Sequence, residues 1–137
     1  MALIPDAITQ FAKARYLNLE TFRKNASGVR TPVWFAEEPP PSSPPGPDQA
    51  VFYIYSEFDA GKVKRIRNNP KVRIAPCNFR GELRGAWVDA IARICPSDEA
   101  AHGQDLLRRK YGLLKIVGDF FAGLRRYKQA VLAVTID

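Results

Sequence analysis

Hydrophobic and polar residues alternate along much of the chain, a pattern typical of strands that bury one face. Together with turn signals and an enrichment in β-branched and aromatic residues, the alternation predicts six strands, at 15–24, 29–36, 51–56, 71–76, 81–94 and 130–136. Residues 25–28 have the composition of a hairpin turn between the first two strands. Pro32 cannot donate to a strand ladder, so we expect it at an edge, at a bulge or where the backbone faces a ligand.

Helical spacing replaces this alternation in four segments, at 3–14, 60–69, 96–111 and 113–124. We expect Asp59 and Ser97 to cap the second and third helices, and Val63 and Ile66 to face inward from the second. Strands and helices do not alternate regularly, which argues against a doubly wound α/β fold. The sequence therefore predicts a mainly β protein, a small antiparallel barrel with helices packed outside.

Length and composition fit one globular domain over residues 1–137, because 46% hydrophobic and 26% charged residues exclude a disordered chain or a coiled coil. The longest apolar stretches, such as 51–55, are too short to cross a membrane, and the first residues lack a secretory signal. We therefore expect a cytoplasmic protein. Residues 39–47 hold six of the eleven prolines and predict an extended, solvated hairpin insertion, with a proline-rich docking motif as the alternative.

A net charge of +7 favours anionic partners, and the charge is concentrated after the third strand. Ser56 ends that strand, Gly61 stands at the expected helix start and Lys62 follows it, an arrangement suited to binding phosphate through helix N–H groups and a lysine. The spacing of a nucleotide-hydrolysing P-loop is absent. Two other interpretations remain open: solvated helix charges, or a nucleic-acid surface.

Candidate chemistry is otherwise sparse. Cys77, Cys95 and the single histidine, His102, cannot form a disulfide framework or a four-ligand metal site, and we expect buried cysteines and an exposed, inert histidine. A bound organic cofactor is then the expected source of any redox chemistry. No catalytic residue is identified; the side chains that could donate a proton, each better explained as structural, are Tyr53, Tyr55 and Tyr111.

An ordered series of motifs over residues 15–136 resembles the pyridoxamine 5'-phosphate oxidase-like split-barrel family, in its branch that depends on the deazaflavin coenzyme F420. The motifs are GVRTPVWF at 28–35, YS at 55–56, GKVKRIRNNP at 61–70, VRIAPC at 72–77, and RG at 80–81 with Gly85. The resemblance implies a six-stranded split β-barrel, usually a homodimer with two cofactor sites at the subunit interface. It places the cofactor phosphate against Ser56, Lys62 and the backbone at Gly61. The tricyclic ring would lie along Thr31, Pro32, Val33 and Trp34, and segments 71–77 and 80–87 would complete the pocket or the interface.

The function implied by the resemblance is hydride transfer between bound F420 and a small organic substrate. FMN is the main alternative cofactor, because the same barrel holds it by the same phosphate contacts. Pyridoxamine 5'-phosphate oxidation is a weaker alternative, because no second phosphate site can be assigned. The non-enzymatic alternative is a nucleic-acid-binding module that uses the basic helix 60–69; it would need Trp34 and Phe35 exposed for base stacking, whereas their apolar context predicts burial.

Overall fold

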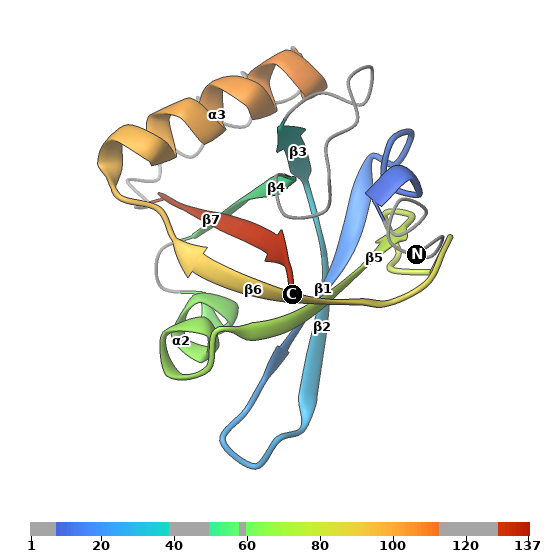
Figure 1. The fold of residues 1–137 in the computed structure, drawn as a ribbon, viewed down its shortest axis with the longest axis vertical. Coiled ribbons are helices and arrows are strands. Elements are labelled where there is room, and N and C mark those ends of the chain that lie inside the picture. The colour runs from blue at the N-terminus through green and yellow to red at the C-terminus, as the bar shows by residue number, and fades with distance from the viewer. Residues whose placement is uncertain (1–7, 39–49, 58–59, 113–128) are drawn as a thin grey trace.

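The computed structural model describes residues 8–38, 50–57, 60–112 and 129–137. The strands in these ranges form one seven-stranded antiparallel sheet in the order β2-β1-β5-β6-β7-β4-β3 (Figure 1). They are β1 (Tyr16–Phe22), β2 (Gly28–Val33), β3 (Phe35–Glu38), β4 (Val51–Glu57), β5 (Lys71–Cys77), β6 (Val88–Ile94) and β7 (Gln129–Ile136). The proline-rich segment 39–47, the predicted cap Asp59 and the predicted helix 113–124 lie outside the described residues.

The sheet curls so that its two edges meet at one residue. Val33, at the end of β2, pairs with Leu17 of β1, whereas Phe35, at the start of β3, pairs with Ile54 of β4. Only Trp34 separates these two edge strands. The prediction of one strand over 29–36 is therefore wrong, and the sheet has seven strands rather than six. Pro32 lies in an edge strand, as predicted, where its missing N–H removes no ladder bond on the open side.

The concave face of the sheet encloses the main hydrophobic core. Its fully buried large side chains include Phe11, Phe35 and Phe52, whose rings pack with centroids 5.0 to 5.9 Å apart. Helix α2 (Gly61–Asn68) closes one end of this core by burying Val63 and Ile66, the two residues predicted to face inward. Ala60, rather than a residue with a capping side chain, occupies the N-cap position.

Helix α3 (Ser97–Tyr111) covers the outer side of β3, β4 and β7 (Figure 1). Gly103 allows this close packing, because a Cβ atom there would lie only 2.8 Å from Val131 Cγ1 and 3.0 Å from Tyr53 Cδ1. The N-cap residue is Pro96 and no side chain caps the helix, so the predicted Ser97 cap is wrong. The acidic first turn, with Asp98 and Glu99, agrees with the sequence and complements the helix dipole.

The predicted strand over 81–94 begins only at Val88, and residues 78–87 instead form a loop over the outer face of β1. Gly81 has φ +86°, a conformation that favours glycine, and its carbonyl accepts a hydrogen bond of 3.0 Å from Asn18 Nδ2. Leu83 is exposed and joins the sheet through a single bridge to Cys77. Leu83 and Ala86, both assigned to the predicted strand, therefore belong to a covering loop.

Beneath this loop, a buried carboxylate on β1 links side chains of the two neighbouring strands. Glu20 of β1 stands opposite Arg30 of β2 and Arg73 of β5 in the strand register. Arg30 Nε donates to Glu20 at 2.9 Å and Arg73 Nε at 2.7 Å, while Trp87 lies 4.9 and 5.0 Å from the two guanidinium carbons. Burial favours a raised pKa for Glu20, but the two arginines together hold that pKa below its ordinary value. The rung thus fixes β2, β1 and β5 in register.

The described part of the predicted N-terminal helix is a short helical turn that places Ile8 and Phe11 in the core. Among the described residues, no helix is both long and apolar enough to span a bilayer.

Candidate functional site

Among the described residues, no side chain caps the backbone donors at the start of α2. The first turn of the helix contains no Asp or Glu, and its N-cap residue, Ala60, has no side chain able to accept a hydrogen bond. The N–H groups at this end and the helix dipole therefore favour an anion. Because β4 ends at Glu57 and α2 begins at Gly61, the predicted residue Ser56 lies at the end of the strand, and Gly61 and Lys62 begin the helix that follows it.

Ser56 is buried and lies on the same side of β4 as the core residues Phe52 and Ile54. Its Oγ donates a 3.2 Å hydrogen bond to the carbonyl of Glu57, the last residue of the strand. A hydroxyl can accept as well as donate, so this bond leaves Ser56 able to contact an anion at the end of β4.

Lys62 and Arg65 are two cations that share the first turns of α2. Burial lowers the pKa of Lys62, the charge of Arg65 lowers it further, and Glu57 opposes both effects. The guanidinium of Arg65 lies across the helix start, since a Cβ atom on Gly61 would be 2.9 Å from one of its terminal nitrogens. Gly61 therefore keeps this approach open, and Arg65, which the sequence places on one stripe of the helix with Lys62, lies beside the residues predicted to hold the phosphate.

The four residues predicted to line the cofactor ring do not share one surface. Val33 belongs to the buried core cluster, and Thr31, two residues before it, points to the same face of β2. Pro32 points to the outer face, near Gly81. Trp34 stacks on Tyr111 of α3, with centroids 4.6 Å apart and planes within 10°. A ring could therefore lie along the backbone here but could not contact all four side chains.

On the outer face of β1, beside Pro32, one buried side-chain oxygen accepts no hydrogen bond from the described residues. Asn18 is directly opposite Pro32 in the register and is buried. Its Nδ2 is bonded to Gly81, whereas its Oδ1 has no hydrogen-bond partner among the described residues. A buried acceptor normally has a partner, so this atom marks a position where a donor is missing, and no sequence signal had singled it out.

The phosphate and ring residues come from separate elements, and none of three cavities lined by described residues contains members of both sets. The structure does bring Arg65 and Asn69, which the sequence places on one stripe of the helix with Lys62, to a single pocket beside Arg23. Arg23 comes from the β1–β2 hairpin, which is distant from α2 in the sequence, so no local pattern could place it at this pocket.

The tyrosines that could serve as proton donors have structural partners. Tyr111 bonds the backbone of Phe35 and Arg15, and Tyr53 lies 3.4 Å from Glu99. Burial, followed by the charge of Glu99, raises the pKa of Tyr53 to about 12. Tyr55 packs near Trp34 and Tyr111. None of these arrangements indicates a catalytic acid.

Cys77 and Cys95 are buried and free, as predicted, and burial raises the pKa of each thiol to about 11. His102 is exposed, as predicted, but it is not without a partner: its Nε2 lies 2.7 Å from a carboxylate oxygen of Glu38.

Comparison with known proteins gives similarity at the level of structure only. No family model matches the chain, and no curated protein matches it in sequence. Among solved structures, HutZ, the heme storage protein from Vibrio cholerae, is 13% identical with a TM-score of 0.66, covering 98% of this chain and 90% of that one. A protein from Listeria innocua described as a candidate pyridoxamine 5'-phosphate oxidase is 10% identical with a TM-score of 0.63, covering 98% and 94%. An F420 reductase is 16% identical with a TM-score of 0.59, covering 94% and 91%.

These identities are too low to carry a function across, but the fold agrees over nearly the whole chain. The curled antiparallel sheet, the two packed helices and these neighbours confirm the fold that the sequence motifs predicted. The chain has the split-barrel fold of the pyridoxamine 5'-phosphate oxidase-like proteins.

Proposed function

We propose that this chain is an F420-dependent oxidoreductase that transfers hydride between the bound deazaflavin and a small organic substrate. The observation that carries the proposal is the pair of cations, Lys62 and Arg65, at the uncapped start of α2. Neither has an ion-pair partner among the described residues. A phosphate group would supply the missing negative charge. The F420 reductase among the structural neighbours adds support at the level of fold.

The phosphate part of the cofactor fits the residues present. Lys62 would provide a full charge at short range, and Ser56 a hydroxyl at the end of β4. The N–H groups around Gly61 would complete the contacts, and the absence of a side chain at Gly61 leaves room for them beside Arg65. These three predicted residues would together hold the phosphate.

The ring part fits through the backbone of residues 31–34 more than through their side chains. Pro32 offers an apolar surface on the outer face of β2, and Trp34 is held in place by its stacking on Tyr111. Thr31 and Val33 would support this edge from the core side. The bound deazaflavin supplies the hydride chemistry; the chain binds and orients the ring and excludes water from it.

FMN remains the alternative cofactor, because the same phosphate contacts would hold it. One of the structural neighbours is a heme storage protein. A heme site is less favoured here, because the only histidine of the sequence, His102 of α3, is paired with Glu38. Nucleic-acid binding by the basic helix is also less favoured: Phe35 is fully buried and Trp34 is packed on Tyr111, so neither is an open stacking platform.

We also expect a homodimer with the cofactor at the subunit interface. The loop over β1 carries the two large hydrophobic side chains that are most exposed among the described residues, Phe79 and Leu83. The same loop covers Asn18 beside Pro32. A second copy packed on this loop would bury these side chains next to the proposed ring site.

Replacing Lys62 tests the phosphate site. Lys62→Met keeps the length of the side chain but removes its charge, so we expect F420 affinity to fall about tenfold, with an unchanged melting temperature. Fluorescence titration of the ligand-free protein with F420, and with FMN in parallel, measures both affinities. Preferential F420 binding favours the deazaflavin function, whereas preferential FMN binding favours a flavin enzyme.

Lys64→Met is the matched control, because Lys64 is an exposed cation in the same helix. We expect it to change the affinity less than twofold. Equal losses in the two variants would mean that the helix attracts anions by general charge alone, and would remove Lys62 from the site. Binding of neither cofactor by the parent protein would reject the proposed function.

A further inference from the structure

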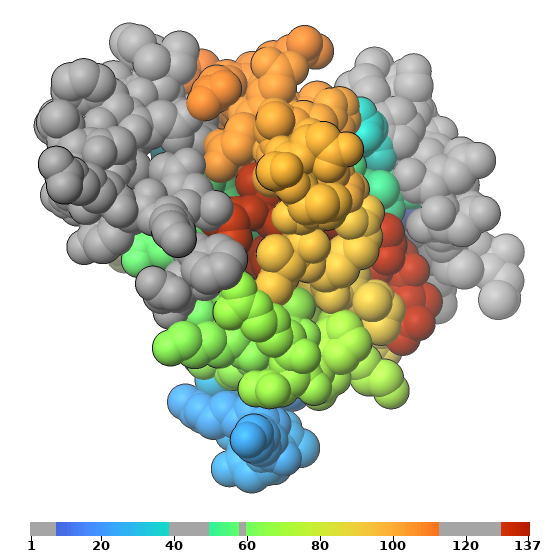
Figure 2. All heavy atoms as spheres, turned by 90° about the vertical axis from the view of Figure 1, so that its left-hand side faces the viewer, coloured from blue at the N-terminus to red at the C-terminus, as the bar shows by residue number. Residues whose placement is uncertain are grey.

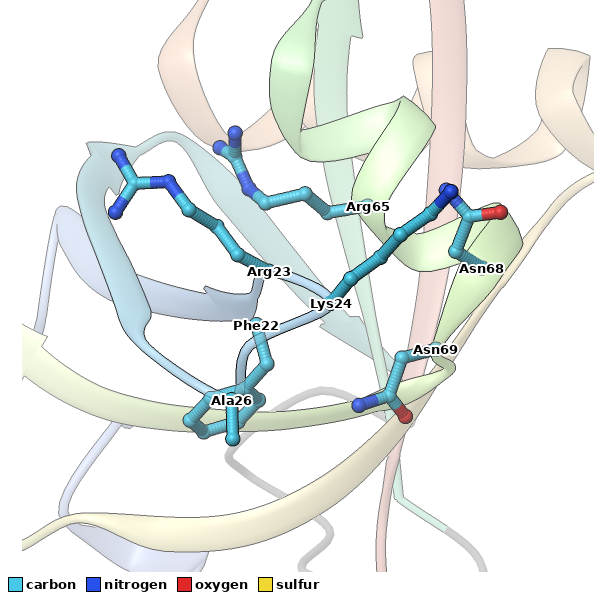
Figure 3. Close-up of a pocket in the computed structure, with 7 residues that line it drawn as sticks. All are labelled: Phe22, Arg23, Lys24, Ala26, Arg65, Asn68 and Asn69. Carbon is cyan, nitrogen blue, oxygen red and sulfur yellow. The ribbon is translucent and has the colours of Figure 1, made fainter.

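A second cationic pocket lies between the β1–β2 hairpin and the side of α2. Figure 2 shows the hairpin, in blue, projecting beyond α2, in green. The cavity has a volume of about 500 Å³, and its lining contains three cations, two amides and no carboxylate (Figure 3). The lining residues are Phe22, Arg23, Lys24, Ala26, Arg65, Asn68 and Asn69.

Neutral hydroxyl groups orient both guanidinium groups of the pocket. Arg65 Nε donates to Thr21 Oγ1 at 2.6 Å, and one terminal nitrogen of Arg23 donates to Ser27 Oγ at 3.3 Å. Each bond uses only one of the five N–H donors of a guanidinium group. The hydroxyls therefore position the two arginines without neutralising them, and leave further donors for a ligand.

The positive charges of Arg23 and Arg65 act on each other. Burial lowers the pKa of Arg65, and the nearby charge of Arg23 lowers it further. Elsewhere in the described part of the chain, arginines such as Arg30, Arg73 and Arg93 are paired with carboxylates. Figure 3 shows Arg23 and Arg65 extending in the same direction from the hairpin and the helix. Among the described residues Arg23 and Arg65 have no carboxylate partner, so the two neighbouring guanidinium groups form an incomplete site.

The amide of Asn69 adds a directed donor. Its Oδ1 accepts a 3.1 Å hydrogen bond from the backbone N–H of Lys71, the first residue of β5. This bond fixes the orientation of the amide and leaves its Nδ2 as the group available to a ligand. Lys24 adds a third charge from the hairpin.

We propose that this pocket binds an oxyanion, a phosphate or carboxylate group, held between the guanidinium groups of Arg23 and Arg65. A planar guanidinium fork matches the geometry of either anion. The lining includes neither Ser56 nor Lys62, but Arg65 belongs both to this pocket and to the proposed phosphate site, so Arg23 is the residue that distinguishes the two. The anion is either a free molecule or a second anionic group on a cofactor bound at the start of α2.

Titration of the ligand-free protein with inorganic pyrophosphate at low ionic strength, followed by amide NMR, tests this site. We expect saturable shifts at residues 23–28 and at Asn68 and Asn69. Arg23→Gln should weaken binding at these amides about tenfold. Arg23 is exposed on the hairpin, so its replacement leaves the core intact. Shifts at Gly61 and Lys62 would report separately on the proposed phosphate site.

Lys64→Gln is the matched control, because it removes one positive charge from α2 at an exposed position outside the pocket. We expect it to change pyrophosphate affinity less than twofold. Equal weakening by Arg23→Gln and Lys64→Gln, or no saturable shift at the hairpin, would overturn the proposal.

A competition experiment identifies the source of the anion. If F420 displaces pyrophosphate from the hairpin amides, and Arg23→Gln weakens F420 binding, the pocket holds an anionic group of the cofactor. If both ligands bind together, the pocket holds a separate anion. Either result supports the site. The test remains distinct from that of Lys62, because Arg23→Gln can abolish the pyrophosphate shifts while F420 affinity is retained.

Discussion

Replacing Glu20 with glutamine should lower the free energy of unfolding by about 2–4 kcal/mol. The neutral amide would leave Arg30 and Arg73 facing each other across β1 without the carboxylate that now accepts from both. The expected loss is below that of a fully buried ion pair because the side chain of Arg30 is 54% exposed, so water compensates part of its charge. Urea unfolding at pH 7 measures the difference.

The pH dependence of stability provides a second measurement on the same variant. The pKa of Glu20 in the folded state is below its ordinary value of 4.5, so its stabilising contribution is complete above pH 4.5. The contribution is lost as the pH falls through the folded-state pKa. The parent protein should therefore lose more stability than Glu20→Gln between pH 7 and pH 3.

Glu57→Gln is the matched control, because it makes the same chemical change at an exposed position at the end of β4. Its effect should stay within about 0.5 kcal/mol. If the two variants lose equal stability, the rung of Glu20, Arg30 and Arg73 does not hold the strands in register.

Local pattern was sufficient to predict the elements that bury one face. The inward positions of α2, Val63 and Ile66, follow from helical spacing, and the strand predicted at 71–76, observed as β5 at Lys71–Cys77, follows from the alternation of residues 71–74. The motif series also predicted the split-barrel fold, although no match of sequence supports it. The three residues proposed to hold the phosphate are close in the sequence, at the end of β4 and the start of α2, so local pattern was sufficient to single them out.

Long-range contacts decide the features that local pattern did not predict. Arg73 and Glu20, which are hydrogen-bonded, are 53 residues apart in the sequence. Asn18 and Gly81, whose hydrogen bond holds the loop over β1, are 63 residues apart. The pocket of Arg23 and Arg65 likewise requires a hairpin and a helix that are distant in sequence. Alternation indicates which face a residue occupies, but not which strand or loop covers that face.

The break at Trp34 has the same origin. Residues 29–36 are continuously strand-like, so nothing local divides them. The division comes from Tyr111, at the end of α3, whose hydroxyl accepts from Phe35 N at 3.0 Å and lies 2.8 Å from Phe35 O. It is also 2.6 Å from the carbonyl oxygen of Arg15, just before β1. One side chain thus satisfies backbone groups at the point where the two sheet edges meet.

Tyr111→Phe should therefore lower the free energy of unfolding by about 2–3 kcal/mol, because the buried N–H of Phe35 would lose its hydrogen-bond partner. The phenyl ring keeps the stacking on Trp34, so the loss would report the hydroxyl alone. Urea unfolding measures the total effect, and hydrogen exchange at the Phe35 amide should become faster in the variant.

Tyr53→Phe is the appropriate comparison, because it removes a hydroxyl from another buried tyrosine, one whose oxygen lies at the longer distance of 3.4 Å from a carboxylate oxygen of Glu99. We expect that variant to lose less than about 1 kcal/mol. Equal losses in the two variants, with unchanged exchange at Phe35, would show that the bend at Trp34 does not need the Tyr111 hydroxyl. A selective effect of Tyr111→Phe would instead identify α3 as the element that joins the two edges of the sheet, and so keeps Trp34 and Pro32 in place at the proposed ring site.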